Sequence, residues 1–339
     1  MSYIEPQPSP FADPRFGFIV GAPRSGTTSL ARWLRTHPDV CFSSTKEPHW
    51  FAQHDLRELE EAALKQRVEH EYIGRFFAEC RPGDFRAEGS VTYLYAAEQV
   101  AVTLKLWPQA RFVICVRDPL QMIPSLHQRL LYLGDETVAD FAEAWALRHR
   151  RARGEAIPRS CIEPRWLRYD EGGRLGTHLE QLLSAVGRER CHVVVFDDLV
   201  SDPAGEYAKV LRFLGLPHDG RTDFSAARSG QAFRIGWLQR LLKRPPVLTR
   251  RMLAGSAMRE HLKAPDEGAG AAKAKGEKRP GLVMRARKRL LRWNRMPARK
   301  TSVPPEIVAE FQQLYAGEVE KLERLTGRDL SHWLGRRQR

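Results

Sequence analysis

A glycine-rich turn between an apolar run and an amphipathic segment constrains the fold of this chain more than any other feature. The run at 16–21, FGFIVG, is rich in aromatic and β-branched residues, which is typical of a buried parallel strand. The turn at 21–28, GAPRSGTT, follows it, and the segment at 29–34 then places apolar residues at helical spacing. Strand, glycine loop and helix in this order predict the opening of a β-α-β unit.

The rest of the chain alternates between short apolar runs and segments with helical periodicity. The apolar runs predict strands at 40–42, 111–116 and 191–196. Helical periodicity predicts a broken helix at 57–80 and further helices at 96–107, after Pro119, and at 138–151, 175–186, 203–214 and 304–325. This alternation favours an α/β fold with three layers, α/β/α, around a central parallel sheet.

The length of 339 residues and the 42% hydrophobic content suffice for one large domain or two small ones. We expect a loose lead-in at 1–15 and a single domain at 16–339. The net charge of +14 is concentrated, since residues 237–300 hold 19 Lys or Arg and four acids. We expect this basic region to be partly flexible, with a glycine-rich loop at 264–280.

The glycine turn has the chemistry of a phosphate-binding loop. Gly21 and Gly26 are spaced as in the motif GxxxxGK[ST], but Thr27 stands where that motif has lysine. Backbone amides, the helix dipole and the side chains of Arg24, Ser25, Thr27 and Thr28 still favour a polyanion. The missing lysine argues against typical ATP hydrolysis. We disfavour the alternative that the glycines serve turn geometry alone.

Two other functions stay open at this point. The run at 193–198 ends in Asp197 and Asp198 and is similar to the strand that holds magnesium in ATP-using P-loop kinases. We favour the simpler interpretation that these acids cap the following turn, because the loop lysine is absent. A protein that holds a nucleotide without chemistry is a third candidate.

Four segments in order resemble PAPS-dependent sulfotransferases, where PAPS is 3′-phosphoadenosine-5′-phosphosulfate. They are the loop at 21–28, the KEPHWF segment at 46–51, the RFVICVRDP segment at 111–119 with Ser125 beyond it, and the VFDDL segment at 195–199 with DP and LRFLGL downstream. The pattern is most similar to the glycan (heparan sulfate-like) branch. It covers about 16–217, with a weaker echo at 304–334, and implies the P-loop NTPase-like sulfotransferase fold.

The resemblance implies roles for individual residues. It makes Glu47 the general base, with Arg24, Lys46 and His49 as further catalytic candidates. It places the donor PAPS, and its product adenosine 3′,5′-bisphosphate, on Arg24, Ser25, Gly26, Thr27, Thr28, Arg117 and Ser125, without a metal. The alternatives are structural: Glu47 as a helix cap or surface acid, Lys46 as a solvated cation, and Arg117 paired with Asp118.

The acceptor implied by the resemblance is a hydroxyl, or an amine, of a carbohydrate-like molecule, and the basic region extends this expectation to a lipid-linked or glycolipid acceptor. The basic segments at 235–253 and 282–296 interleave apolar residues with Arg and Lys, which is typical of helices on anionic membrane surfaces. The alternative is a helix pair that covers the cofactor cleft. No nucleic-acid partner is expected, because no recognised nucleic-acid module accompanies the charge.

Five cysteines, odd in number and scattered, predict neither a disulfide framework nor a zinc site. We therefore expect a reducing compartment. The N-terminal residues lack the pattern of a secretory signal, and no apolar stretch approaches about 18 residues. These observations predict a cytoplasmic protein, with contact at a membrane surface as an open addition.

Overall fold

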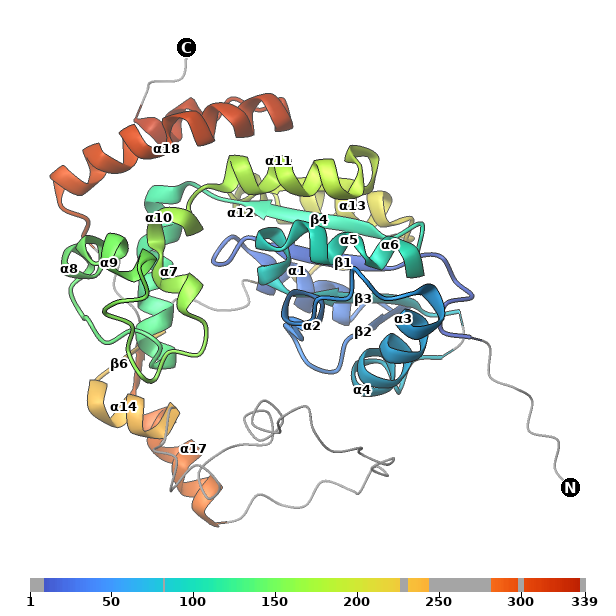
Figure 1. Cartoon of the computed structure of the whole chain (residues 1–339), viewed down its shortest axis with the longest axis horizontal. Helices are drawn as coiled ribbons and strands as arrows, with labels where there is room; N and C mark the ends of the chain where they lie inside the picture. Colours follow the sequence, from blue (N-terminus) through green and yellow to red (C-terminus); the bar gives the residue numbers. More distant parts are fainter. Residues whose placement is uncertain (1–8, 82, 226–230, 244–281, 298–301, 336–339) are drawn as a thin grey trace, which may run out of the picture. The chain divides into compact units, whose positions relative to one another are not determined.

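The computed structural model describes residues 9–81, 83–225, 231–243, 282–297 and 302–335. Its centre is a five-stranded sheet in the order β2-β3-β1-β4-β5, and all the pairings are parallel (Figure 1). The strands are β1 (Gly17–Gly21), β2 (Val40–Phe42), β3 (Phe85–Gly89), β4 (Arg111–Val116) and β5 (Cys191–Val195). Helices cover both faces, so the predicted three-layer α/β/α fold is confirmed.

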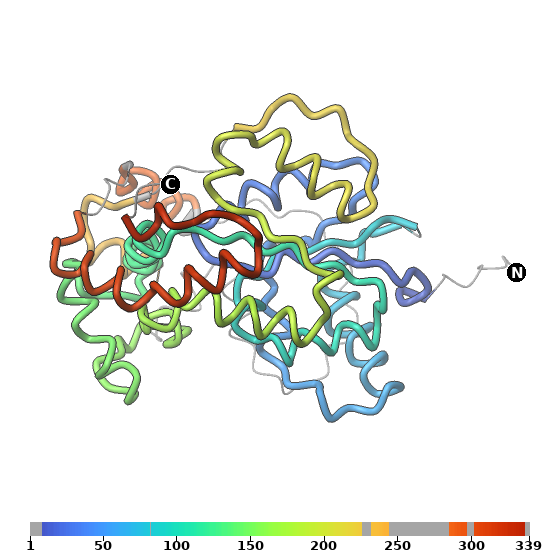
Figure 2. The backbone as a smooth tube through the Cα atoms, turned by 90° about the horizontal axis from the view of Figure 1, so that it is seen from above, coloured from blue at the N-terminus to red at the C-terminus, as the bar shows by residue number. Residues whose placement is uncertain are grey.

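The two faces of the sheet are covered differently because successive strand residues point to opposite sides. On one face Ile19, Val113 and Val194 pack with α1 (Thr27–Arg35) and α13 (Pro203–Leu214). On the other face Phe18 stacks on Phe112 with ring centroids 5.4 Å apart, inside an aromatic cluster. Figure 2 shows α13 and α11 (Leu175–Val186) on opposite sides of the sheet.

The helices largely follow the predicted periodicity. The broken helix at 57–80 consists of α3 (Glu61–Arg67), a π-helical turn (Val68–Ile73) and α4 (Gly74–Phe76). The remaining helices are α2 (Trp50–Gln53), α5 (Ala97–Ala101), α6 (Thr103–Leu106), α7 (Pro119–Leu133), α8 (Phe141–Ala146), α9 (Arg148–Ala152), α10 (Tyr169–Gly172), α12 (Phe196–Ser201), α14 (Gly236–Lys243), α17 (Leu282–Asn294) and α18 (Pro305–Thr326), together with a 3₁₀ turn at Val91–Tyr95.

The chain divides into two compact units. The first consists of residues 1–123, 171–227 and 305–339, and it contains the whole parallel sheet. The second consists of 124–170 and 228–304, and includes a small antiparallel sheet of β6 (Gln231–Phe233) and β7 (Arg295–Pro297). The expected single domain at 16–339 remains a prediction, and the glycine-rich loop at 264–280 lies outside the described residues.

The second unit contains a buried ion pair. Arg151 Nη1 lies 2.7 Å from Glu136 Oε2, and both side chains are almost fully buried. Glu136 also accepts from the Tyr169 hydroxyl at 2.9 Å and from the amide groups of Thr137 and Val138. Every oxygen of this carboxylate is therefore hydrogen-bonded, as a buried charge requires.

The expectation of no disulfide is wrong for one pair. Cys41 of β2 is bonded to Cys80, which follows α4, with the two Cα atoms 5.6 Å apart. The 39-residue separation carries no recognisable spacing, and the fold brings the two cysteines together where α4 meets the end of the edge strand β2, since the Ser44 amide donates to the Phe76 carbonyl at 2.9 Å. The other three cysteines are free.

We expect reduction of the Cys41–Cys80 bond to lower the free energy of unfolding by about 2–4 kcal/mol, because an open loop gives the unfolded chain more conformations. Thermal denaturation with and without reductant measures the effect. The double variant C41A/C80A should melt at the temperature of the reduced protein and lose its response to reductant. Equal melting temperatures for the oxidised and reduced protein would contradict the prediction.

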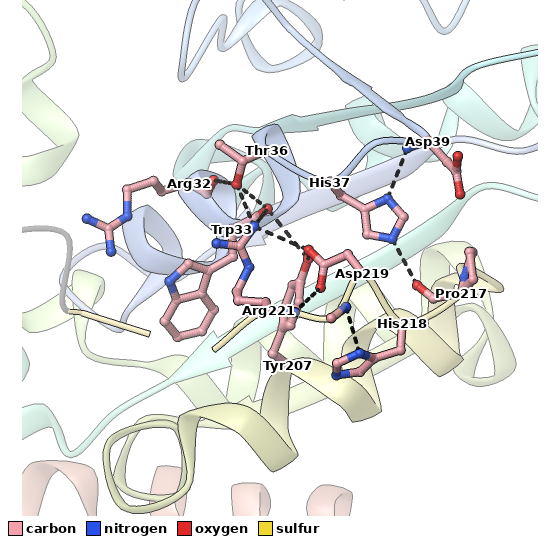
Figure 3. Close-up of polar contacts among 11 residues, drawn as sticks. Arg32, Trp33, Thr36, His37, Asp39, Tyr207, Pro217, His218, Asp219 and Arg221 are labelled. Carbon is pink, nitrogen blue, oxygen red and sulfur yellow. Dashed lines mark hydrogen bonds and ion pairs between the residues drawn. The ribbon is translucent and has the colours of Figure 1, made fainter. Parts of the chain in front are cut away.

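Polar contacts hold the carboxyl end of α1, the helix that begins at the glycine loop (Figure 3). Arg221 Nη2 donates to the Trp33 carbonyl at 3.2 Å and to Thr36 Oγ1 at 2.6 Å. Asp219 bonds the same guanidinium and accepts from the Tyr207 hydroxyl. A cation at this end of a helix stabilises the exposed carbonyls and the helix dipole. The far end of the loop helix is thereby fixed.

Candidate functional site

The predicted site residues gather where the parallel strands end. β1 leads into the glycine loop, β2 into the turn with Lys46, Glu47 and His49, and β4 into Arg117. Ligands of open α/β sheets bind at this carboxyl edge. Gly21 lies against the turn after β3, since a Cβ at Gly21 would be 2.7 Å from Leu94 Cβ and 3.2 Å from the Val91 carbonyl. The loop and the β3 turn are therefore in direct contact.

The glycine loop has the backbone of an anion site. Gly26 precedes α1 with φ of 93°, and a Cβ there would be 2.5 Å from Leu199 Cδ2 of α12, so only glycine fits. Ser25 and Thr27 are buried and Thr28 is exposed at the helix start. No acidic residue occupies the first turn of α1 to offset the positive end of the helix dipole.

Arg117 joins β4 to the glycine loop. Its Nη1 donates to the Arg24 carbonyl at 2.9 Å, and its guanidinium lies over the Phe196 ring at 4.3 Å. Gln121 accepts from the other amino group at 3.1 Å. The Arg117 side chain donates to Gln121 and not to Asp118. The structural alternative, an Arg117–Asp118 pair, is therefore not supported by a hydrogen bond. Ser125 lies further along α7, in the second unit, so its contact with the same ligand remains a prediction.

Three of the four predicted catalytic residues have a left-handed backbone conformation. The φ angles are 63° at Arg24, 64° at Glu47 and 58° at His49. Such angles are uncommon for residues with a Cβ and cost on the order of 1 kcal/mol each. Conformations of this kind persist where surrounding contacts impose them, and they cluster at functional sites.

Glu47 is held between two cationic or polar neighbours. Lys46 Nζ bonds Glu47 Oε1, and His49 Nε2 lies 3.7 Å from Glu47 Oε2. Burial raises the pKa of Glu47, but the His49 and Lys46 interactions outweigh it and lower the pKa to about 2. The charge of Lys46 also acts on Cys115 of β4, whose carbonyl accepts from the Ala22 amide at 2.6 Å. The described contacts of Lys46 therefore place its ammonium group on Glu47.

Sequence reasoning missed the residues of β3 and its turn that hold His49. The His49 amide donates to Ser90 Oγ at 2.9 Å, and His49 Nδ1 lies 2.9 Å from Thr92 Oγ1. Ser90 Oγ in turn donates to Glu88 Oε2 at 3.1 Å. Glu88 is fully buried, and burial raises the pKa of its carboxyl to about 7. The sequence signal that could have identified these residues is the run EGSVT at 88–92, where the overlooked strand β3 ends.

The sequence model described as the sulfotransferase family matches residues 18–90 and 94–220, more than half of the chain. The chain belongs to the sulfotransferase family. Among curated relatives, a protein-tyrosine sulfotransferase of Drosophila melanogaster is 24% identical over 212 residues, covering 59% of this chain and 38% of that protein. Heparan sulfate glucosamine 3-O-sulfotransferase 3B1 of Mus musculus is 27% identical over 202 residues, covering 58% and 45%.

This sulfotransferase-family chain spans less than half the length of those two relatives. A solved structure shares its fold over nearly the full length. The crystal structure of a sulfotransferase from Alicyclobacillus acidocaldarius superposes with a TM-score of 0.61 at 23% identity, covering 94% of this chain and 97% of that one. The predicted sulfotransferase fold is therefore confirmed.

The magnesium-binding alternative for Asp197 and Asp198 is not favoured in this family member. Asp197 Oδ2 accepts from Trp333 Nε1 at 2.7 Å, and Asp198 Oδ1 accepts from Arg328 Nη2 at 2.8 Å. Both acids stand in the first turn of α12, but the expectation that they cap this turn is wrong, because the N-cap is Val195 and no side chain caps the helix. They bind the C-terminal segment. No cluster of His, Cys, Asp and Glu suited to a metal ion occurs among the residues that the structure describes.

Proposed function

We propose that the protein transfers the sulfuryl group of PAPS to a hydroxyl, or an amine, of a carbohydrate-like or glycolipid acceptor, with Glu47 as the general base. One observation carries this proposal. The Glu47 carboxylate is flanked by Lys46 and His49, and the turn after β3 contacts both His49 and Gly21 of a phosphate-binding loop that lacks the NTPase lysine. A P-loop kinase would need that lysine and a magnesium-binding acid, and Asp197 and Asp198 are engaged elsewhere.

Different residues are proposed to bind the two anionic groups of the nucleotide, the 5′-phosphosulfate and the 3′-phosphate. The amides and hydroxyls at 25–28 fit the 5′-phosphosulfate, because the helix start is positive and carries no acid of its own. Arg117 and Ser125 are proposed for the 3′-phosphate. Arg24 and Lys46 would stabilise the negative charge that develops on the transferred group and the leaving phosphate.

The Lys46–Glu47 pair has a consequence for the base. A carboxylate with a pKa of about 2 is ionised at neutral pH but is a weak proton acceptor. A donor anion placed beside Lys46 would draw the ammonium away from Glu47 and raise the pKa of the carboxylate. Donor binding would thus prepare Glu47 for an acceptor hydroxyl held within hydrogen-bond reach.

The carbohydrate-like acceptor is supported by the KEPHWF segment and by the likeness to the heparan sulfate 3-O-sulfotransferase. The likeness to the protein-tyrosine sulfotransferase makes a tyrosine-containing peptide the rival acceptor. A phenolic hydroxyl is acidic and needs less help from a base than a sugar hydroxyl. Strong dependence of turnover on Glu47 therefore favours the sugar.

Thermal-shift measurements with nucleotides test the proposal at low cost. Adenosine 3′,5′-bisphosphate should raise the melting temperature, because a ligand that binds only the folded state stabilises it. ATP with magnesium serves as the comparison and should have a smaller effect. Stabilisation by ATP with magnesium alone would overturn the proposed donor.

We also propose peripheral contact with an anionic membrane through the surface of α14 and α17. Among the described residues, seven large apolar side chains are exposed, and four of them lie on these two helices: Trp237, Leu241, Leu290 and Trp293. The guanidinium of Arg234 lies over the Trp293 ring at 5.7 Å. The described parts of 231–243 and 285–295 contain Arg and Lys but no acid. Anionic lipid complements such a face.

Flotation with vesicles tests the membrane contact. The protein should float with vesicles of phosphatidylcholine and phosphatidylglycerol but not with phosphatidylcholine alone, and W237A/W293A should lose binding. Absence from both vesicle types would end this proposal. A loss of adenosine bisphosphate affinity in W237A/W293A would instead support the helix pair as a cover for the cofactor. No helix in the described ranges is long and apolar enough to cross a bilayer.

The cytoplasmic location is part of the proposal. The Cys41–Cys80 bond weighs against it, because disulfides persist mainly in oxidising compartments. Thiol trapping of the protein extracted from its native cells would show whether that bond exists there.

A further inference from the structure

We propose that Thr92 is a positioning residue for sulfuryl transfer: its hydroxyl bonds His49 Nδ1 and, when the ring is neutral, fixes the imidazole proton on Nε2, facing the Glu47 carboxylate. This inference rests on the proposed function, because it concerns the same base. Thr92 lies in the turn after β3, outside the segments that first indicated a sulfotransferase.

The tautomer follows from the partners on the two sides of the ring. His49 Nε2 faces Glu47 Oε2 at 3.7 Å, and an ionised carboxylate can only accept. The proton of a neutral imidazole therefore belongs on Nε2. Nδ1 then has a lone pair, and the hydroxyl 2.9 Å away must be the donor. A 3.7 Å separation is long for a hydrogen bond, but such contacts often tighten when substrate binds.

A second contact from the same turn holds the His49 backbone. The His49 amide donates to Ser90 Oγ, and Ser90 Oγ donates to the fully buried Glu88. Ser90 and Thr92 thus fix the amide and the ring of one residue from a single turn. These contacts offset the cost of the left-handed backbone at Glu47 and His49.

The fixed imidazole has two effects on Glu47. The N–H directed at Oε2 holds that oxygen on the side of His49, while Oε1 bonds Lys46. The same N–H occupies Nε2, so His49 has no free lone pair with which to compete for the acceptor proton. A misplacement of about 1 Å at a reacting group costs on the order of 100-fold in rate. Loss of the Thr92 hydroxyl should therefore lower kcat more than it alters nucleotide binding.

Two substitutions of matched shape test the role of the hydroxyl. T92V keeps the branched shape and removes the hydroxyl, and we expect it to lower kcat by roughly 10-fold to 100-fold with the PAPS KM nearly unchanged. T92S keeps the hydroxyl and should recover most of the rate. T103V removes another buried hydroxyl, one that bonds the Val100 carbonyl in the core, and should leave kcat unchanged. A T92V enzyme with wild-type kcat would overturn the proposal, as would a T92S enzyme as slow as T92V.

Nitrogen NMR of histidine-labelled protein provides a readout that needs no turnover. At a pH where the ring is neutral, the His49 signals, assigned with H49Q, should show a protonated Nε2 and an unprotonated Nδ1. A protonated Nδ1 in the neutral ring would overturn the tautomer. If E47Q retains full turnover, the base assignment fails. The NMR result still decides the Thr92 contact, so the two failures are distinguishable.

Discussion

Replacing Glu47 with glutamine is expected to lower kcat by about 10²–10⁴-fold, the usual contribution of a positioned general base. Glutamine keeps the size and one oxygen of the side chain but cannot take a proton. Initial rates with labelled PAPS and a panel of sugar, glycolipid and tyrosyl acceptors would measure the effect. E79Q, an exposed acid on the same unit, is the matched control.

The affinity of E47Q for adenosine 3′,5′-bisphosphate should stay close to that of the wild type, because Glu47 is not placed on the nucleotide. Calorimetric titration measures this affinity. A strong loss of nucleotide affinity would reassign Glu47 to a structural role, and unchanged turnover would remove it from the base role.

Replacing Arg151 with methionine is expected to lower the free energy of unfolding by about 3–5 kcal/mol. The change would leave the Glu136 carboxylate buried without its cation, although Tyr169 and two amides would still donate to it. In the intact protein these interactions, led by Arg151, overcome burial and lower the pKa of Glu136. Urea denaturation followed by circular dichroism measures the loss.

The neighbouring arginine provides the control for Arg151. Arg150 lies on the same helix, its side chain is 57% exposed, and R150M should change stability by less than about 0.5 kcal/mol. The double variant E136Q/R151M should recover part of the loss, because no unpaired charge remains. Equal stability of R151M and R150M would show that the buried pair contributes nothing to folding.

The sequence predicted the strands that are continuous apolar runs and missed the one that is not. β1 and β4 are buried between helix layers and β5, at the edge of the sheet, is buried at Val194 and Val195; all three are apolar runs, so apolarity alone predicts them. β3 reads FRAEG, and its Arg86 and Glu88 conceal a strand that lies between β1 and β2. Glu88 is tolerated in the interior because burial raises its pKa to about 7, toward the neutral form, and Ser90 Oγ donates to one of its oxygens.

The sequence names candidate site residues, which remain predictions, and it does not reveal their arrangement. Glycine spacing and the KEPHWF segment point to Arg24, Glu47 and His49 as candidates. Their left-handed backbone could not be predicted, because residues of these types rarely adopt it. The contact between Arg117 and the Arg24 carbonyl joins segments 93 residues apart, and only the fold brings them together. Thr92 escaped notice because threonine is common and its role depends on one neighbour.

The contacts of the C-terminal segment bear on how the protein can be divided for experiments. The family match ends at residue 220, yet α18 packs on α11, and Arg328 and Trp333 bind the acids of α12. Leu199 of that same α12 closes on Gly26 of the glycine loop. A fragment trimmed to the family match would expose the apolar side of α11. It would also leave the carboxylates of Asp197 and Asp198, on α12, without the donors Trp333 and Arg328. An expression fragment that is meant to bind nucleotide must therefore extend through residue 334.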